Sequence, residues 1–344
     1  MASVEQFDLA AAAYGGLVNE DVMQKIFDIS NITLPLSDRI GTDSHKNAFC
    51  EWTTDALQAV DTSNAYVDSA PTTGIADENL GSRKGNHTQT SVKVVKVGSI
   101  AQSSDTIGFA DALAYQIMQR QKELRRDVEA TMLTNQASVK ETTGTAGVSA
   151  GLGAWIKDNG SDNGSTAGGW TSSTGIVDAR TSGGDATDVV MTEAMVRDAI
   201  KDVYIDGGES TVFMTTPSLV EQFSIFLFSS GARIAALQSD VREKTSGVTA
   251  TAAVKLFVSD FGTVEIVANR LQQVEGTTTC VNAFVLDPSM LRLSYMDGYK
   301  TEPLAKTGLF DQYQMRVSWS LKVLNEDAQA IIADIIQTGT VTAT

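Results

Sequence analysis

The residue types that most often carry catalysis are sparse in this chain. Its only histidines are His45 and His87, and neither lies in an HExxH zinc motif or beside a nucleophile motif. No GxxxxGK[ST] phosphate loop is present. The 42 acidic residues are spread along the chain, so closeness in sequence singles out no general acid–base pair. We expect no catalytic residues and no cofactor.

Two stretches imitate ligand-binding loops. Residues 158–164 read DNGSDNG, like the start of a calcium loop, but Gly169 stands where an EF-hand needs a bidentate carboxylate. Residues 147–153 read GVSAGLG, but no strand precedes them and Trp155 stands where a helix would hold phosphate. We expect surface loops and assign no metal ligand, with a loose divalent-cation site as the lesser alternative.

Composition indicates a folded protein outside the membrane. Of 344 residues, 42% are hydrophobic, and no run of 18 apolar residues predicts a membrane span. The first residues carry acids where a signal peptide needs bases, so secretion is not expected. Cys50 and Cys280 are too few for a disulfide framework, and we expect both to be buried free thiols.

The net charge of −16 is distributed unevenly. Residues 1–80 hold 13 acids and 3 bases, whereas residues 81–142 hold 6 acids and 9 bases. Binding to DNA depends on Lys and Arg, so we expect the subunit alone to bind nucleic acid poorly. The charge supports solubility in any case, and segments of opposite sign can also attract each other between copies.

The longest helical pattern covers residues 109–136. Arg125 and Glu129 are spaced as an i,i+4 ion pair on its polar side, and Asp105 or Thr106 can cap its start. The apolar side is formed by residues that recur at helical spacing, namely Leu113, Ile117, Leu124, Val128 and Met132.

A second feature is a predicted antiparallel ribbon of strands 48–53 and 87–97, with a long polar excursion over 54–87. Two strands alone are marginally stable in water, so the ribbon needs a surface to lie on. A neighbouring subunit is one candidate. Arg83 and Lys84 lie near the expected tip of the ribbon, outside any apolar pattern, and are our candidate inter-subunit contacts.

The other elements complete an α+β fold. Asn19 and Thr192 can cap short helices, and Pro217 can open another. Trp155 and Trp170 should anchor part of the Gly-rich segment 141–187 to the body. The expected strands are 211–216, 255–259 and 263–268 around a three-residue Asp260–Gly262 loop, 281–286 and 290–295 around Asp287–Ser289, and 314–324.

A series of strings along nearly the whole chain resembles the major capsid (major head) proteins of tailed bacteriophages, in particular a podovirus-like family. The strings that carry the resemblance are NEDVMQKIFDIS (19–30), PLSDRIG (35–41), EWTTDAL (51–57), GSRKGNHTQ (81–89), DTIGFADALAYQ (105–116), KELRRDVEATMLTNQAS (122–138), GLGAWI (151–156), LAKTG (304–308) and LKVLNEDAQAII (321–332). Residues 157–300 carry fewer recognisable strings.

The resemblance implies the Hong-Kong-97-type capsid fold. Its N-terminal arm would be residues 1–46 and its extended E-loop 47–104. A peripheral domain, 105–190, would contain the spine helix 109–136 and an inserted Gly-rich loop, 141–187. An axial domain would cover 191–298, and a last strand and helix in 299–344 would return to the peripheral domain.

The resemblance also implies a structural function. Copies would form pentamers and hexamers of an icosahedral head in the virion, after synthesis in the bacterial host cytoplasm. Portal and scaffolding proteins, and in some heads a decoration protein, would be partners; packaged DNA would be contacted only non-specifically, and no membrane is involved. The alternative is a phage tail-tube or surface-layer-type subunit, for which the long helix and the missing export signal are unfavourable.

Overall fold

The computed structural model describes residues 33–57, 60–63, 65, 67–68, 81–104, 111–183, 189–229, 256–272 and 280–337. The short helix expected after Asn19 and the candidate caps Asp105 and Thr106 lie outside these residues. In the part of the chain so described, no helix combines the length and hydrophobicity needed to cross a membrane. The described chain forms two compact units: residues 93–122 with 301–315, and residues 33–92 with 123–300 and 316–337.

The first unit contains the short helix α2 (Ser99–Ser103) and the start of the long helix α3 (Ala112–Met132). Helix α3 begins later than the predicted residue 109, because its cap is Asp111. The Asp111 Oδ1 atom accepts hydrogen bonds from the backbone N–H groups of Leu113 (2.9 Å) and Ala114 (3.0 Å). Hydrogen bonds, first from the Gln102 side chain and then from Ala114, lower the pKa of this carboxyl.

The later turns of α3 belong to the second unit and confirm the predicted apolar stripe there, since Leu124, Val128 and Met132 are all buried. The prediction for Glu129 was wrong. Its side chain is fully buried, and its two oxygens accept hydrogen bonds from the backbone of Leu36 (2.7 Å) and Ser37 (2.8 Å), the Ser37 hydroxyl, and the Asn269 side chain (3.0 Å). Partners 93 and 140 residues away replace the expected Arg125.

A four-stranded sheet has the order β1-β12-β13-β4. Strand β1 runs parallel to β12, with Gly41 opposite Arg292. The predicted apolar face of the last long strand, from Met315 to Val323, is buried as expected. Burial does not alternate there, however, because Ser318, Ser320 and Lys322 on the other face are buried as well. The strand bounds are Gly41–Ser44 (β1), Leu291–Pro303 (β12), Phe310–Val323 (β13) and Gln89–Gly98 (β4).

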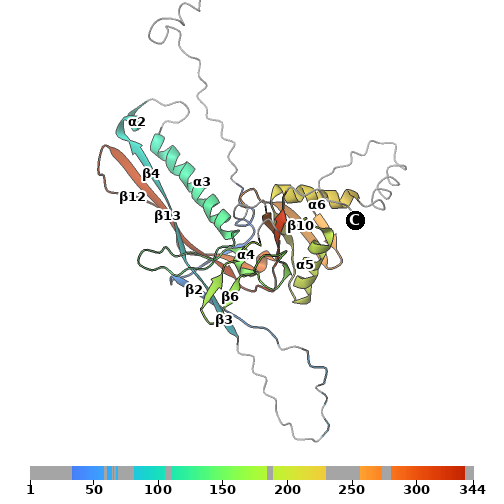
Figure 1. Cartoon of the computed structure of the whole chain (residues 1–344). Helices are drawn as coiled ribbons and strands as arrows, with labels where there is room; N and C mark the ends of the chain where they lie inside the picture. The colour runs from blue at the N-terminus through green and yellow to red at the C-terminus, as the bar shows by residue number, and fades with distance from the viewer. Residues whose placement is uncertain are drawn as a thin grey trace, which may run out of the picture. The chain divides into compact units, whose positions relative to one another are not determined.

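A six-stranded sheet in the second unit has the order β5-β14-β11-β8-β10-β9. Helices α5 (Glu193–Ile205) and α6 (Pro217–Ser229) lie beside it (Figure 1) and bury residues such as Val203 and Phe223 with its strands in one core. The predicted caps are confirmed: the Thr192 hydroxyl accepts from Met195 N–H, and Pro217 opens α6. The bounds are Gly160–Ser161 (β5), Ala330–Ile336 (β14), Cys280–Leu286 (β11), Val212–Thr215 (β8), Gly262–Ala268 (β10) and Leu256–Ser259 (β9).

Two local predictions in this sheet were wrong. The β9–β10 hairpin pairs Ser259 with Gly262, so its turn has two residues instead of three; Gly262 takes a positive φ of 147°. The expected C-terminal helix is β14, which pairs antiparallel with β11. Its nearly continuous apolar run, AIIADII, suits a strand that is buried on both faces.

The ribbon consists of β2 (Phe49–Thr54) and β3 (Ser82–His87), which pair antiparallel from Phe49–His87 to Thr54–Ser82. The predicted strands 48–53 and 87–97 both exist, but their predicted pairing was wrong. The second is β4 and belongs to the four-stranded sheet. Residues 82–87, placed in the polar excursion by sequence, supply the true partner strand.

The Gly-rich segment is anchored as predicted. Its short helix α4 (Leu152–Trp155) is entirely buried, and β6 (Gly169–Thr171) pairs with β7 (Ile176–Asp178). The short 3-10 turn η2 (Pro288–Met290) leads from β11 into β12. Cys50 and Cys280 are buried free thiols, as expected.

Candidate functional site

The two candidate residues, Arg83 and Lys84, occupy adjacent positions near the start of β3 and therefore point to opposite sides of the ribbon. The Arg83 side chain is 70% exposed, and its Nη2 atom lies 2.8 Å from Glu51 Oε1 on β2. The Lys84 side chain is only 19% exposed, and its Nζ atom lies 3.5 Å from Glu326 Oε2. Sequence reasoning treated the pair as equivalent surface charges. In the structure both pair with a carboxylate of their own chain, but only the Lys84 pair is largely buried.

Lys84 lies beside an acidic cluster, which consists of Glu326 and Asp327 in the turn between β13 and β14 together with Asp158. Burial raises the pKa of Glu326; Lys84 opposes that rise, and the carboxylates of Asp158 and Asp327 add to it. Burial likewise raises the pKa of Asp327, against the effect of Lys84. An open pocket of about 210 Å³ adjoins the cluster and is lined by Thr54, Asp55, Ala56, Gly81, Ser82, Lys84, Asn325 and Asp327.

Asn86 fastens the base of the ribbon. Its buried side-chain amide donates to Ser149 Oγ (3.1 Å), Ala150 O (3.4 Å) and Leu321 O (2.8 Å) and accepts from Ala150 N–H (2.9 Å). Gly85 beside it leaves room for the Phe49 ring, because a Cβ there would lie 2.5 Å from Phe49 Cζ and 3.0 Å from the Cys50 carbonyl oxygen. Sequence reasoning missed both. The signal was an Asn next to a Gly inside a strand, where both residue types are uncommon.

Three tryptophans join β2 to the Gly-rich segment. The ring centroids of Trp52 and Trp155 are 5.3 Å apart, and those of Trp155 and Trp170 are 6.2 Å apart with an interplanar angle of 2°. Offset and stacked aromatic pairs of this kind stabilise by about 1 kcal/mol beyond their burial. The ribbon is therefore held at its base by Asn86, Lys84 and Trp52, while Arg83 is presented to solvent.

The histidines and the calcium-like loop hold structural positions. His45 lies between the hydroxyls of Ser294 and Thr88, each at 2.8 Å, and burial lowers the pKa of His45. Asp162 of the calcium-like loop pairs with the buried guanidinium of Arg180. Within the described residues, no group of three or more His, Cys, Asp or Glu side chains is arranged to hold a metal ion.

Comparisons with known proteins support the family resemblance that the sequence indicated. The family model of the SU10 major capsid protein matches residues 5–336. A major capsid protein of Escherichia phage Phieco32 is 35% identical over 104 residues, 30% of this chain; the match spans only 29% of the length of that relative.

Similar solved structures include the capsid of the cyanophage P-SCSP1u, with a TM-score of 0.59, 12% identity, and coverage of 97% of this chain and 99% of the other. The capsid of the Myoviridae phage XM1 has a TM-score of 0.57 and 10% identity, covering 93% of this chain and 100% of the other. At such low identities these similarities concern the fold, and they confirm the predicted α+β capsid fold of the Hong-Kong-97 type.

Proposed function

Because this chain belongs to the SU10 major capsid protein family, we propose that it is the major capsid protein of a phage. Copies of the chain associate head-to-tail into pentamers and hexamers, which close into an icosahedral head around double-stranded DNA. The observation that carries this proposal is the family match, which continues from residue 5 to residue 336. It thus includes both sheets, helix α3 and the ribbon.

We propose the following roles for the parts of the chain. Residues 1–46 form the N-terminal arm, 47–104 the E-loop, 105–190 the peripheral domain with its insertion, and 191–298 the axial domain. The six-stranded sheet supports a compact axial domain, since α5, β8, α6, β9, β10 and β11 all fall within 191–298. The segment 299–344 includes the return strand β13, and its strand β14 adds to the sheet of the axial domain.

Arg83 is the more suitable of the two candidate contacts. Its exposed guanidinium can add a neighbour's carboxylate to the one it already meets in Glu51. Lys84 acts mainly within its own subunit by keeping the base of the ribbon attached. We propose that the ribbon crosses to an adjacent copy and that Arg83 contributes to this contact.

The remaining assignments follow from the capsid function. The net charge of −16 favours an inner wall that packaged DNA contacts only non-specifically. Portal and scaffolding proteins are the expected partners during assembly, and a decoration protein is a further candidate. The subunit has no enzymatic role, is made in the host cytoplasm and ends in the virion.

Assembly of the purified full chain tests the proposal. Native mass spectrometry over a concentration series should show pentamers, hexamers or larger shells, and negative-stain images should show closed particles. A strictly monomeric protein at all concentrations would contradict self-assembly. Tubes or flat lattices would instead favour a tail-tube or surface-layer subunit.

A further inference from the structure

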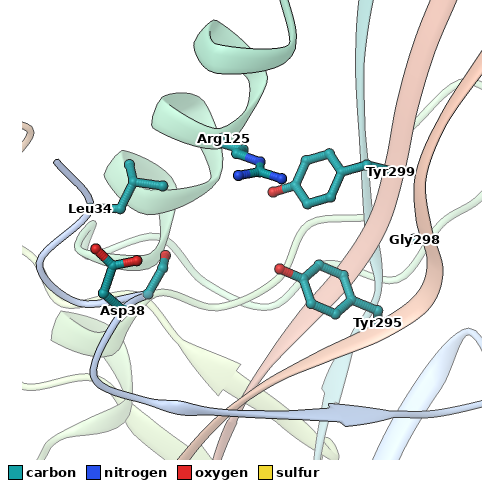
Figure 2. A pocket seen from close by; sticks show the side chains of 7 residues that line it. Leu34, Asp38, Arg125, Tyr295, Gly298 and Tyr299 are labelled. Carbon is teal, nitrogen blue, oxygen red and sulfur yellow. The ribbon is translucent and has the colours of Figure 1, made fainter. Parts of the chain in front are cut away.

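An open pocket of about 320 Å³ lies in the second unit between α3, β12 and the turn that follows Thr33. Figure 2 shows the Arg125 side chain on one wall, the Tyr295 and Tyr299 rings on another, and Leu34 and Asp38 opposite. Gly298 widens the β12 wall, because nothing lies within 4 Å of the position that its Cβ would occupy.

The Arg125 guanidinium is left without its expected carboxylate. Sequence spacing pairs Arg125 with Glu129, but Glu129 faces the interior, where its oxygens accept four hydrogen bonds. Arg125 instead lies over the Tyr299 ring, with Cζ 5.4 Å from the ring centroid. In the described part of the chain, no carboxylate lies within ion-pair distance of Arg125. A ring face occupies none of the guanidinium N–H donors.

The two tyrosines add a hydroxyl donor beside this cation. The ring centroids of Tyr295 and Tyr299 are 5.9 Å apart on the same wall, and each phenol carries one O–H donor that an acceptor in the pocket can reach. Burial raises the pKa of both Tyr295 and Tyr299, so both hydroxyls stay protonated at neutral pH. A planar guanidinium next to a phenol hydroxyl is a suitable set of donors for one carboxylate group.

We propose that this pocket receives the carboxylate of an Asp or Glu side chain from a second copy of the chain. The inference rests on the proposed self-assembly and names one of its contacts. Each copy supplies 42 acidic residues and only 26 basic ones, so a cation without a carboxylate matches the excess charge of its neighbours. Asp38 on the opposite wall repels any anion, so the pocket suits a single carboxylate held on the Arg125 side better than a polyanion such as DNA, which needs several cations together.

Zero-length cross-linking of the full chain tests the contact. The variant Arg125→Lys keeps the charge and supplies an amine that a carbodiimide can join to a touching carboxylate. Shells are assembled from a mixture of ¹⁴N- and ¹⁵N-labelled Arg125→Lys subunits and analysed by mass spectrometry. We expect a mixed-isotope cross-link from position 125 to an Asp or Glu of another copy. Shells that give only same-copy links, for example to Asp38, or no link at position 125, overturn the inference without touching the proposed function.

A second variant measures the effect on assembly. Arg125→Gln removes the charge at an exposed helix position, so the thermal midpoint of the free subunit should change little, whereas shell yield should fall about tenfold. The control Lys140→Gln removes the same charge at an exposed position outside the pocket and should assemble normally. Normal shell yield for Arg125→Gln overturns the inference. So does duplex DNA binding by the wild-type subunit that Arg125→Gln abolishes, because the ligand would then be a phosphate.

Discussion

The six-stranded sheet and the β2–β3 ribbon, both in the second unit, are stabilised by different interactions. The sheet buries apolar side chains against α5 and α6, and residues such as Phe213, Val285 and Ile332 are almost inaccessible to water. The ribbon has two strands with mixed exposure and no helix of its own. Its fixed points are Asn86 and Lys84, two polar side chains that are bonded to other segments.

This difference indicates that the six-stranded sheet stabilises the subunit, whereas the ribbon provides a surface that a neighbouring subunit can contact. A large apolar core gives cooperative stability that depends little on pH, because its side chains do not titrate. A ribbon held by a few hydrogen bonds and one ion pair keeps a long, polar, exposed surface available. The four changes below should therefore have effects that decrease from the core of the sheet to the exposed side of the ribbon.

The largest effect is expected for Phe213→Ala in the core of the sheet. Removing a buried aromatic ring leaves a cavity and should reduce the free energy of unfolding by about 4 kcal/mol. Urea denaturation of the purified subunit measures it. Val258→Ala on the edge strand β9, where the side chain is 66% exposed, is the matched control and should cost less than about 0.5 kcal/mol. Similar losses for both variants would show that the sheet is not the stable core.

Asn86→Ala should have the next largest effect. It leaves the buried backbone N–H of Ala150 and carbonyl of Leu321 without this partner, which should cost about 3 kcal/mol in total. Hydrogen exchange should show faster exchange in 49–54 and 82–87 than in the six-stranded sheet. Ser82→Ala is the control: it removes one exposed hydroxyl contact, to Thr54 (2.7 Å), and should leave protection nearly unchanged. Uniform loss of protection over both regions would contradict a separately fastened ribbon.

Lys84→Met should make stability depend more strongly on pH. Glu326 has a raised pKa when folded, so its protonated form is favoured in the fold, and stability falls as pH rises from about 4.5 through that raised pKa. Without Lys84 the pKa rises further, and the ionised carboxylate is left unpaired. We expect a loss of about 2 kcal/mol at about pH 7.5 that shrinks toward pH 5. Denaturation curves at both pH values measure it, and an equal loss at both would sink this account.

Arg83→Glu should have the smallest effect on stability, within about 0.5 kcal/mol, because Arg83 is 70% exposed. Its effect should appear in assembly, where reversed charge repels an acidic neighbour and lowers shell yield. Arg83→Lys keeps the charge and should assemble normally. If Arg83→Glu forms shells at full yield, the ribbon makes no electrostatic contact at this position.

Sequence patterns correctly predicted the elements that are determined by residues close together in the chain. The apolar face from Met315 to Val323, the Thr192 cap and the Pro217 helix start each depend on a few neighbouring residues, and the structure confirms them. The family resemblance added the fold type, which no local pattern contains.

The errors concern partners that are distant in sequence. Glu129 has the spacing of a surface residue, but its partners are 93 and 140 residues away. The strand Ser82–His87 has no apolar alternation, because Asn86 replaces hydrophobic burial with hydrogen bonds. Lys84 was assigned to the surface for the same reason, since its counter-ion Glu326 follows 242 positions later and only the fold brings the two together.

Because β14 lies inside the six-stranded sheet, the sheet can be completed only late in synthesis of the chain. Of the strands in the six-stranded sheet, β14 is translated last, yet it lies between β5 and β11 and separates them. While a ribosome is still synthesising residues before 330, β11 lacks one neighbour and β5 has none. The nascent chain therefore cannot complete this sheet early, and its finished surfaces appear only after residue 336 has been added. We therefore expect that chains still missing β14 do not join the lattice.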